Sequence, residues 1–400
     1  MPAGQIGDRM KKIAFVVHRY GLDVNGGAEY HCRVLAEHMA SRYEVDVLTS
    51  CSKSTLPWDN AYSKGMEQIN GINVYRFRVE HTRDDVLFEE LSKKVGGGEK
   101  EVEDEWIAQM GPYCPSMILF LEKNADQYVA VIFVTYAFYS TVKGMGLHLK
   151  NSILLPTAHD DASIRLPIYR EVFQSPAAFL YNSVEEREFI IENFHTEAKL
   201  SRLTCVGIDI PEKETGVLPD SVRPYKDQYI VYAGRVSQGK NFGELNRDFI
   251  EYKRRNPSSL KLVVIGKTDD KMPLIYSEDI IYAGFVTEEE KTAVLKNARL
   301  LVMPSLYESL SLVILESMAS GRPVLVNGRC AVLKGQCIRS NAGLYYTNFF
   351  EFEAALKYML SDGEAYQQMC ENGYHFVKEN YDWNKVAANV GSLIEEISGK

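Results

Sequence analysis

The sequence predicts an α/β protein built from two domains, each a parallel β-sheet covered by helices. The chain has 400 residues, which exceeds the size at which a single hydrophobic core normally keeps growing. Residues 13–17, 28–39 and 43–49 read in order as a β-branched strand, an amphipathic helix and a second strand, which make a βαβ unit. A second series of the same kind opens with the apolar run 229–233. Strands that alternate with helices in both halves are typical of parallel sheets.

Short apolar runs indicate the remaining strands of the first half, at residues 72–78, 129–134, 152–155 and 203–206. A helix is expected at residues 185–193. The segment 87–126 is charged and helical in tendency, with breaks at 96–98 and 111–115, where glycine and proline gather. An insertion of this kind often lies beside a ligand-binding site.

The second half repeats the pattern after a segment without periodicity. Residues 211–224 combine proline, glycine and charge, so we place the interdomain linker there. The predicted strands that follow are residues 229–233, 260–265, 280–282, 300–303, 324–326 and 343–346. Helices should fill the gaps between them, and a final helix is expected at about residues 383–397.

Composition and charge exclude several classes of protein. Hydrophobic residues make up 46% and charged residues 25% of the chain, which is ordinary for a soluble globular protein and argues against disordered and fibrous classes. The formal net charge of −9 disfavours a protein built to grip nucleic acid. Contact between a local basic patch and an anionic membrane stays open.

Cysteine usage indicates a reducing compartment. The seven cysteines are an odd number, are widely scattered and form no Cys-x-x-Cys pair. This usage favours reduced thiols, mostly buried, over a disulfide framework or a zinc site. No segment reaches the roughly 18 uncharged apolar residues that a membrane span needs. We therefore expect a cytoplasmic protein, with a place at the inner face of the membrane left open.

The segment 304–324 carries the most informative pattern. The apolar run before it predicts a buried strand, whose carboxyl end delivers the next residues to the crevice where open α/β sheets bind ligands. Glu308 then lies on the connecting loop, and Glu316 lies about two turns later on the same side. Ser309 and Ser311 can cap the intervening helix, whose N-terminus favours a phosphate. Such a pair of glutamates suits sugar and ribose hydroxyls, whereas a solvated helix face is the usual alternative.

Two cations follow the first strand of the second half. Arg235 and Lys240 lie five residues apart, and Gly234 and Gly239, which directly precede them, loosen the turn. Breaking a sugar–phosphate bond leaves a nucleoside diphosphate with new charge, which cations must stabilise. The sequence contains no Asp-x-Asp metal motif, and two side-chain cations with a helix N-terminus can replace a metal ion. We therefore expect no metal and no cofactor, and the alternative is an ordinary polar surface loop.

These residues carry a family resemblance. The Glu-seven-residues-Glu pattern resembles the signature of retaining nucleotide-sugar glycosyltransferases of family 4, also described as glycosyl transferases group 1. Further pieces of the family pattern recur in order along nearly the whole chain, at residues 26–29, 159–160, 206–209, 234–236, 240–241 and 284–286. One departure concerns residues 309–311, which read Ser-Leu-Ser where many members have Gly-Phe-Gly. Glycines would let the backbone come closest to the ligand, so this change leaves the sugar identity open.

The resemblance implies the GT-B fold. In this fold two Rossmann-like domains with parallel sheets face an interdomain cleft. The implied boundaries are 11–210 for an acceptor-binding domain and 225–378 for a nucleotide-sugar-binding domain. A C-terminal helix at 379–400 is expected to cross back to the first domain.

The resemblance also implies roles for individual residues of the second domain. Arg235 and Lys240 would hold the diphosphate, Glu308 would bind donor-sugar hydroxyls and Glu316 would accept hydrogen bonds from the ribose. Val286 would meet the base through its main chain, although a buried valine at a strand end would look the same. The residues expected around the phosphate cradle are Ser309, Leu310, Ser311 and Leu312.

Three residues of the first domain complete the expected site. By resemblance, His159 faces the donor sugar and hydrogen-bonds one of its hydroxyls, and the alternative is a structural histidine at a strand end. Gly26 and Gly27, on the first βα loop, let the backbone approach a diphosphate or an acceptor closely.

The predicted function is that of a retaining glycosyltransferase in glycan or glycoconjugate biosynthesis. It would move a sugar from a nucleoside-diphosphate donor to a hydroxyl of a glycan, a lipid-linked acceptor or a small molecule. Two alternatives stay open: a nucleotide-sugar 2-epimerase, which shares the architecture, and a non-catalytic nucleotide-sugar-binding module. Neither the sugar, the base, the acceptor nor the oligomeric state follows from the sequence.

Overall fold

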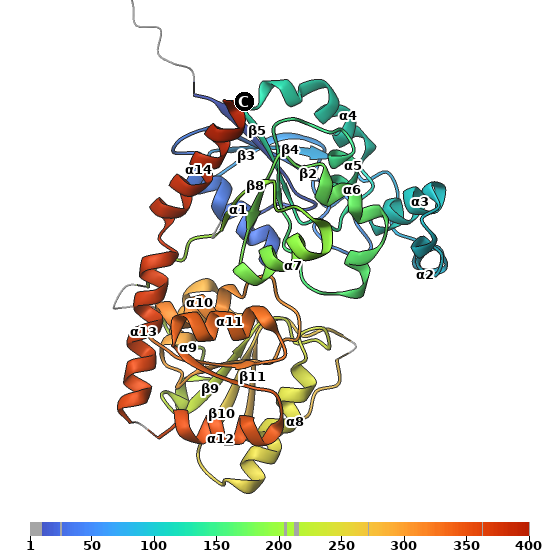
Figure 1. The fold of residues 1–400 in the computed structure, drawn as a ribbon. Coiled ribbons are helices and arrows are strands. Elements are labelled where there is room, and N and C mark those ends of the chain that lie inside the picture. The colour runs from blue at the N-terminus through green and yellow to red at the C-terminus, as the bar shows by residue number, and fades with distance from the viewer. Residues whose placement is uncertain are drawn as a thin grey trace, which may run out of the picture. The chain divides into compact units, whose positions relative to one another are not determined.

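The computed structural model describes residues 10–24, 26–203, 206–211, 216–270, 272–361 and 363–399. These residues divide into two compact α/β units (Figure 1). The first runs to Val206 and also takes the chain from Asn384 onward, and the second spans Gly207–Trp383. Residues 216–224, which the sequence indicated as part of a linker, pack inside the second unit, where Val222 is fully buried.

The first unit contains an eight-stranded sheet in the order β3-β4-β2-β1-β5-β6-β7-β8. Neighbouring strands are parallel except for the antiparallel β3–β4 pair at one edge. The strand order reverses beside β1, because β2 lies on one side of it and β5 on the other. The strands are β1 Lys12–Val16, β2 Glu44–Ser50, β3 Gly65–Ile69, β4 Ile72–Phe77, β5 Ala130–Val134, β6 Ser152–Leu155, β7 Ala178–Tyr181 and β8 Leu200–Leu203.

Helices connect and cover these strands (Figure 1). The last helix, α14, returns to this unit: Asn389 Nδ2 donates to the Leu203 carbonyl at 2.7 Å, and Arg202 pairs with Glu396 at 2.9 Å. The helices are α1 Gly27–Met39, α2 Asp85–Ser92, α3 Lys100–Met110, α4 Pro115–Asn124, α5 Tyr139–Met145, α6 Ile168–Gln174, α7 Val184–Phe194 and α14 Trp383–Ser398, with short 3-10 turns η1 Val95–Gly97, η2 Ala125–Gln127 and η3 Ala162–Arg165.

The second unit has a six-stranded parallel sheet in the order β11-β10-β9-β12-β13-β14. Here the order reverses between β9 and β12. The strands are β9 Tyr229–Ala233, β10 Lys261–Ile265, β11 Ile280–Gly284, β12 Leu301–Met303, β13 Val324–Asn327 and β14 Gly343–Tyr346. The helices are α8 Phe242–Arg255, α9 Glu288–Lys296, α10 Leu312–Ala319, α11 Ala331–Ser340, α12 Phe349–Met359 and α13 Glu364–Asn380, with η4 at Arg223–Tyr225.

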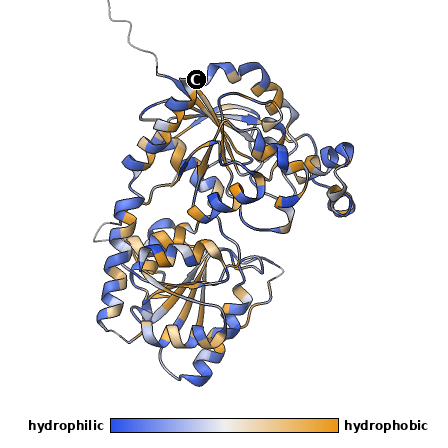
Figure 2. Ribbon diagram, viewed as in Figure 1, coloured by the Kyte–Doolittle hydropathy of each residue, from blue (hydrophilic) through white to orange (hydrophobic). Residues whose placement is uncertain are grey.

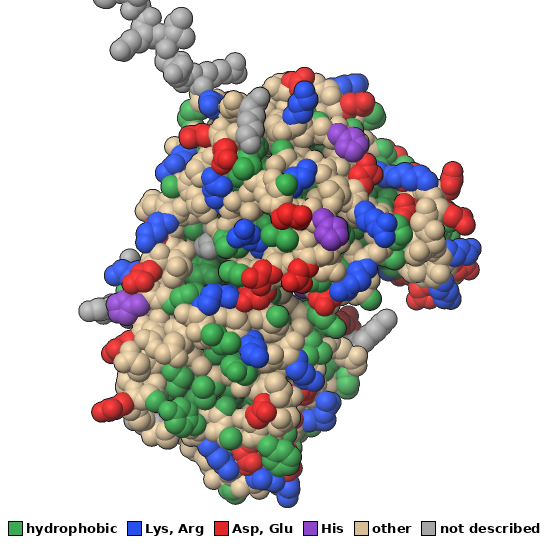
Figure 3. Space-filling view, in the orientation of Figure 1, with side chains coloured by type: hydrophobic (Ala, Val, Ile, Leu, Met, Phe, Trp, Pro, Cys, Tyr) green, Lys and Arg blue, Asp and Glu red, His purple; other side chains and the backbone are tan. Residues whose placement is uncertain are grey.

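The core of each unit follows its central strands. Every residue of β5 and of β9 is buried, as expected for parallel strands covered on both faces. Figure 2 shows the same division, with hydrophobic strands and hydrophilic outer helix faces. None of the helices in the described ranges is long and apolar enough to cross a membrane. On the face shown in Figure 3, basic and acidic side chains are interspersed.

Most predicted elements are confirmed, and three differ. The strand expected at 203–206 lies earlier, at Leu200–Leu203, because this half-buried edge strand lacks a continuous apolar run. Positions 204 and 205 lie outside the described residues. Strand β3 was not predicted, because its side chains are almost all exposed. Strand β7 was not predicted either, because it has only four residues. The expectation of buried thiols is confirmed for five of the six cysteines that the structure describes, and Cys205 lies outside it.

Candidate functional site

The carboxyl ends of β9, β10 and β11 are joined through glycine backbone. Gly266 donates its N–H to the Gly284 carbonyl at 2.8 Å, and Gly234 donates to Ile265 at 3.0 Å. Gly266 has φ +132°, and an added Cβ would lie 2.0 Å from the Gly234 carbonyl oxygen. Only glycine fits this position, so the loops after these strands approach one another closely.

Lys240 and Glu308 meet at the edge of the sheet where the strand order reverses. Lys240 follows β9 and Glu308 follows β12, which are neighbouring strands. The Lys240 ammonium donates to Glu308 Oε1 at 2.7 Å, and the Glu308 side chain is only 10% exposed. Such a reversal point is where open α/β sheets bind ligands. The structure therefore brings together two residues that the sequence separately predicted for the site.

A carbonyl-centred network holds the loop that carries Glu308. The Pro304 carbonyl accepts hydrogen bonds from Asn241 Nδ2 at 3.1 Å and from Asn327 Nδ2 at 2.9 Å. Asn241 directly follows Lys240 and has a left-handed backbone with φ 55°, a conformation that asparagine tolerates better than most residues. The network thus ties the Lys240 loop, the end of β13 and the Glu308 loop together. Sequence reasoning missed the part that Asn327 plays.

The start of α10 differs in one respect from the expectation. Ser311 is the N-cap residue and is buried, but its side chain makes no capping hydrogen bond. The predicted serine cap is therefore wrong for Ser311. Ser309 and Leu310 lie half-buried in the preceding loop, and Leu312 is the first helical residue. The amino end of α10 thus lies a few residues after Glu308.

Arg235 lies on the same loop as Lys240, just after β9. Its backbone is held because the Tyr232 hydroxyl donates to the Arg235 carbonyl at 2.6 Å. The residue is exposed, and within the described ranges its guanidinium forms no ion pair. The two predicted cations therefore share one loop at the β9 end of the sheet.

Glu316 belongs to an ion-pair triad that the sequence did not indicate. The Lys291 ammonium lies 3.0 Å from Glu316 Oε1 and 2.7 Å from Glu288 Oε2. Burial acts to lower the pKa of Lys291, but the two carboxylates outweigh it and raise that pKa. Lys291 lies 25 residues from Glu316 and on another helix, so no local pattern links them. Helix α9 begins two residues after Val286, which is half-buried.

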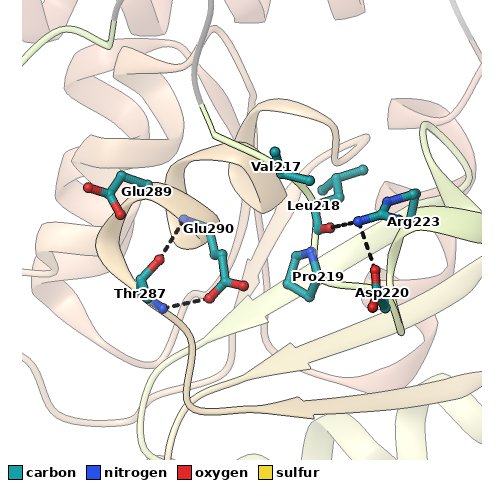
Figure 4. A pocket seen from close by; sticks show the side chains of 8 residues that line it. All are labelled: Val217, Leu218, Pro219, Asp220, Arg223, Thr287, Glu289 and Glu290. Carbon is teal, nitrogen blue, oxygen red and sulfur yellow. Dashed lines mark hydrogen bonds and ion pairs between the residues drawn. The ribbon is translucent and has the colours of Figure 1, made fainter.

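A cavity of about 350 Å³ lies beside the amino end of α9 (Figure 4). There the Thr287 and Glu290 side chains cap the helix reciprocally. Across the cavity, Arg223 pairs with Asp220 at 2.7 Å. None of the predicted site residues lines it. The lining residues are Val217, Leu218, Pro219, Asp220, Arg223, Thr287, Glu289 and Glu290.

The first βα loop of the first unit surrounds a buried carboxylate. Glu29 on α1 accepts from His18 Nε2 at 2.9 Å and pairs with Arg19. Burial alone would raise the pKa of Glu29, but His18 and Arg19 outweigh it and lower the pKa to about 2. Gly26 has no room for a side chain, since an added Cβ would lie 2.1 Å from Glu29 Oε2. Gly27 has open space around it.

His159 follows β6 in the first unit and contacts a neighbouring acid. Its Nε2 lies 3.3 Å from Asp161 Oδ2, and its side chain is 37% exposed. The sequence pointed to His159 but not to Asp161 as its partner. In the part of the chain that the structure describes, no three His, Cys, Asp or Glu side chains lie close enough to hold a metal ion.

Comparisons with known proteins agree with this architecture. Residues 227–362 match the family model described as Glycosyl transferases group 1. An uncharacterized glycosyltransferase of Methanocaldococcus jannaschii is 26% identical, over 97% of this chain and 100% of its own length.

Solved structures resemble the whole chain. A sucrose-phosphate synthase from Thermosynechococcus elongatus has a TM-score of 0.69 and 17% identity, over 97% of this chain and 99% of its own. HepE of Anabaena, in complex with UDP-glucose, has a TM-score of 0.66 and 14% identity, over 97% of this chain and 100% of its own. These likenesses confirm the predicted fold class of two Rossmann-like domains with parallel sheets.

Proposed function

We propose that this protein, whose residues 227–362 match the family model described as Glycosyl transferases group 1, is a metal-independent, retaining glycosyltransferase of family 4 that uses a nucleoside-diphosphate sugar. The observation that carries the proposal is the Lys240–Glu308 contact of 2.7 Å across the reversal point of the second sheet. It places a cation and a carboxylate side by side, a few residues before the amino end of α10. A donor needs both groups: a cation for its phosphates and an acceptor for its sugar hydroxyls.

The second unit binds the donor. Arg235, Lys240 and the amino end of α10 hold the diphosphate, because cations and helix N-termini both favour phosphate. Glu308 accepts hydrogen bonds from sugar hydroxyls while Lys240 turns partly to the phosphate. Glu316, fixed by Lys291 at 3.0 Å, accepts from the ribose hydroxyls. HepE of Anabaena, whose structure is similar, is in complex with UDP-glucose, which supports a nucleotide-sugar donor.

The chemistry needs no enzyme nucleophile. The bond between the anomeric carbon and the phosphate oxygen breaks, and its electron pair goes to the leaving diphosphate. Arg235 and Lys240 stabilise the charge that develops there, which is the largest demand of the step. The acceptor hydroxyl attacks the same face of the sugar and passes its proton to the leaving phosphate. The product therefore keeps the anomeric configuration of the donor.

The first unit contributes the remaining contacts. His159 bonds a hydroxyl of the donor sugar, and Gly26 and Gly27 let the backbone approach the substrate. Val286, in the second unit, meets the base through its main chain. The acceptor is a glycan, a lipid-linked sugar or a small molecule in the cytoplasm or at the inner face of the membrane.

The test is transfer itself. The full chain is incubated with a panel of nucleoside-diphosphate sugars and candidate acceptors in EDTA, and mass spectrometry detects the added hexose and the released diphosphate. We expect Lys240→Ala and Glu308→Ala to lose about 10- to 100-fold in kcat/KM, since a charge-assisted hydrogen bond is worth about 1.5–3 kcal/mol. Lys226→Ala, at an exposed lysine of the same unit, is the matched control.

Three outcomes would contradict the proposal. They are unchanged transfer in both site variants, isomerisation of the donor without an acceptor, and thermal stabilisation by nucleotides without any turnover.

A further inference from the structure

The two carboxylate oxygens of Asp161 have different partners. Oδ1 accepts from the backbone N–H groups of Ser163 at 2.8 Å and of Ile164 at 3.1 Å and from the Ser163 hydroxyl, and so caps the short turn η3. Oδ2 lies 3.3 Å from His159 Nε2 and accepts from the Tyr136 hydroxyl at 3.2 Å. One oxygen thus supports the turn, and the other faces His159. The partners come from the loops that follow β5 and β6, which are neighbouring strands.

Tyr136 donates to Asp161 from a buried position. Its side chain is 3% exposed and packs edge-to-face against Tyr169, with ring centroids 4.8 Å apart. Burial, and then the charge of Asp161, raise the pKa of Tyr136. The hydroxyl therefore stays protonated and donates a hydrogen bond to Asp161 Oδ2, which holds the carboxylate in one orientation.

The backbone beside His159 is held in an unusual conformation. Thr157 and Thr135 both have left-handed backbones, with φ 50° and φ 72°, which is a genuine outlier for a β-branched residue. Such a conformation costs about 1–3 kcal/mol per residue and persists only where the surroundings over-determine it. The Thr157 hydroxyl donates to Thr135 Oγ1 at 3.1 Å. Strained residues of this kind cluster at functional sites.

A buried carboxyl group, that of Glu186, anchors the same loop. Glu186, which is 2% exposed, accepts from the Ala158 backbone N–H at 2.6 Å through Oε1 and from Asn182 at 2.6 Å through Oε2. The residue before His159 is therefore tied to the end of β7. His159 thus follows a backbone that is tied to the sheet, and its ring faces Asp161.

We propose that Asp161, held by Tyr136, is a positioning residue that fixes the ring orientation and tautomer of His159 for sugar transfer. The inference rests on the proposed function, in which His159 bonds a donor-sugar hydroxyl. A carboxylate oxygen facing Nε2 favours the tautomer with its proton on that nitrogen. In the neutral imidazole Nδ1 is then the acceptor nitrogen, the atom suited to receive a hydrogen bond from a hydroxyl.

Because Asp161 uses Oδ1 to cap η3 and Oδ2 to face His159, a substitution can remove the contact with His159 and keep the cap. In Asp161→Asn, an amide oxygen at the Oδ1 position keeps the cap of η3, but the amide nitrogen at the Oδ2 position can accept from neither His159 nor Tyr136. Tyr136→Phe keeps the buried ring and removes only the hydroxyl. Asp160→Asn is the matched control, because the neighbouring Asp160 is exposed and pairs with Arg165 at 2.6 Å.

The experiment measures kcat and the donor KM for each variant, alone and in a His159→Ala background. We expect Asp161→Asn to lower kcat about tenfold, which corresponds to the loss of one hydrogen bond of ordinary strength, with KM and the melting temperature little changed. Tyr136→Phe should have a smaller effect in the same direction. In the His159→Ala background neither substitution should cost further activity, since both act through the ring.

A second readout does not depend on turnover. Nitrogen-15 NMR of labelled histidine should show the Nε2–H tautomer of His159 in the native protein and a changed tautomer population in Asp161→Asn. An unchanged population, or an equal loss of activity with and without His159, would overturn the proposal. A protein without any transfer activity would contradict the proposed function alone, because the tautomer measurement still decides the role of Asp161.

Discussion

Acid should weaken the first unit through a single buried carboxylate, Glu29. Its pKa is lowered from 4.5 to about 2, and such a difference corresponds to about 3 kcal/mol of native-state stability. The folded pKa lies below the unfolded one, so this stability is present above pH 4.5 and is lost as the pH falls toward 2. By the same relation, about 2 kcal/mol should be gone by pH 3.

Replacing Glu29 with glutamine isolates this contribution. The amide cannot titrate, so the stability difference between the native protein and Glu29→Gln should shrink by about 2 kcal/mol between pH 7 and pH 3. Urea denaturation at a series of pH values measures that difference. Fluorescence in a Trp383→Phe background follows the first unit, because Trp58, whose ring lies 6.1 Å from that of His18, and Trp106 both belong to it.

A second glutamate on the same helix, Glu37, serves as the control. Glu37 lies on α1 and contacts Arg33 at 3.6 Å, with 24% of its side chain exposed. An ion pair four residues apart on a helix contributes only about 0.3–0.5 kcal/mol, so the stability of Glu37→Gln should stay within about that amount of the native protein at every pH. If Glu29→Gln also ran parallel to the native protein, the buried pairing of Glu29 with His18 and Arg19 would not control acid stability, and the reasoning would fail.

Two further predictions concern backbone and buried charge. Burial raises the pKa of Glu186 from 4.5 to about 8, so native stability should fall as the pH rises from 4.5 to 8, by up to about 5 kcal/mol. In urea denaturation, the free energy of unfolding of Glu186→Gln should depend less on pH than that of the native protein. An equal pH dependence of the two proteins would contradict this prediction. Gly266→Ala should destabilise the second unit by about 3 kcal/mol or more, because the new Cβ would lie 2.0 Å from the Gly234 carbonyl oxygen at φ +132°. Gly363→Ala has open space around its added Cβ, with the nearest neighbour at 4.0 Å, and loses only the preference for glycine at the N-cap of α13. It should therefore cost about 1 kcal/mol or less, and equal melting of the two variants would refute the steric argument.

Local patterns in the sequence were sufficient for most of the fold. Strands buried on both faces, such as β5 and β9, read as continuous apolar runs, and the helices between them show amphipathic spacing. Edge strands carry weaker signals: β3 is exposed along most of its length, and β8 is half-buried throughout. The sequence therefore missed the first and misplaced the second.

The candidate site, too, could be predicted only in part: its residues follow from the sequence, but their contacts do not. Lys240 and Glu308 were predicted separately, each from residue types near a strand end. Their contact at 2.7 Å arises only because β9 and β12 are neighbours in the sheet, although the residues lie 68 positions apart. No periodicity within a window of one or two turns can encode such a pairing.

The sequence by itself determined which residue types stand at the ends of which strands. Tertiary structure alone decided the partners: Lys291 beside Glu316, Asn327 on the Pro304 carbonyl, and Asp161 between His159 and Tyr136. The physical reason is that helix and strand periods are set by neighbours along the chain, whereas hydrogen bonds and ion pairs between elements depend on strand order and register, which are fixed only when the whole sheet packs.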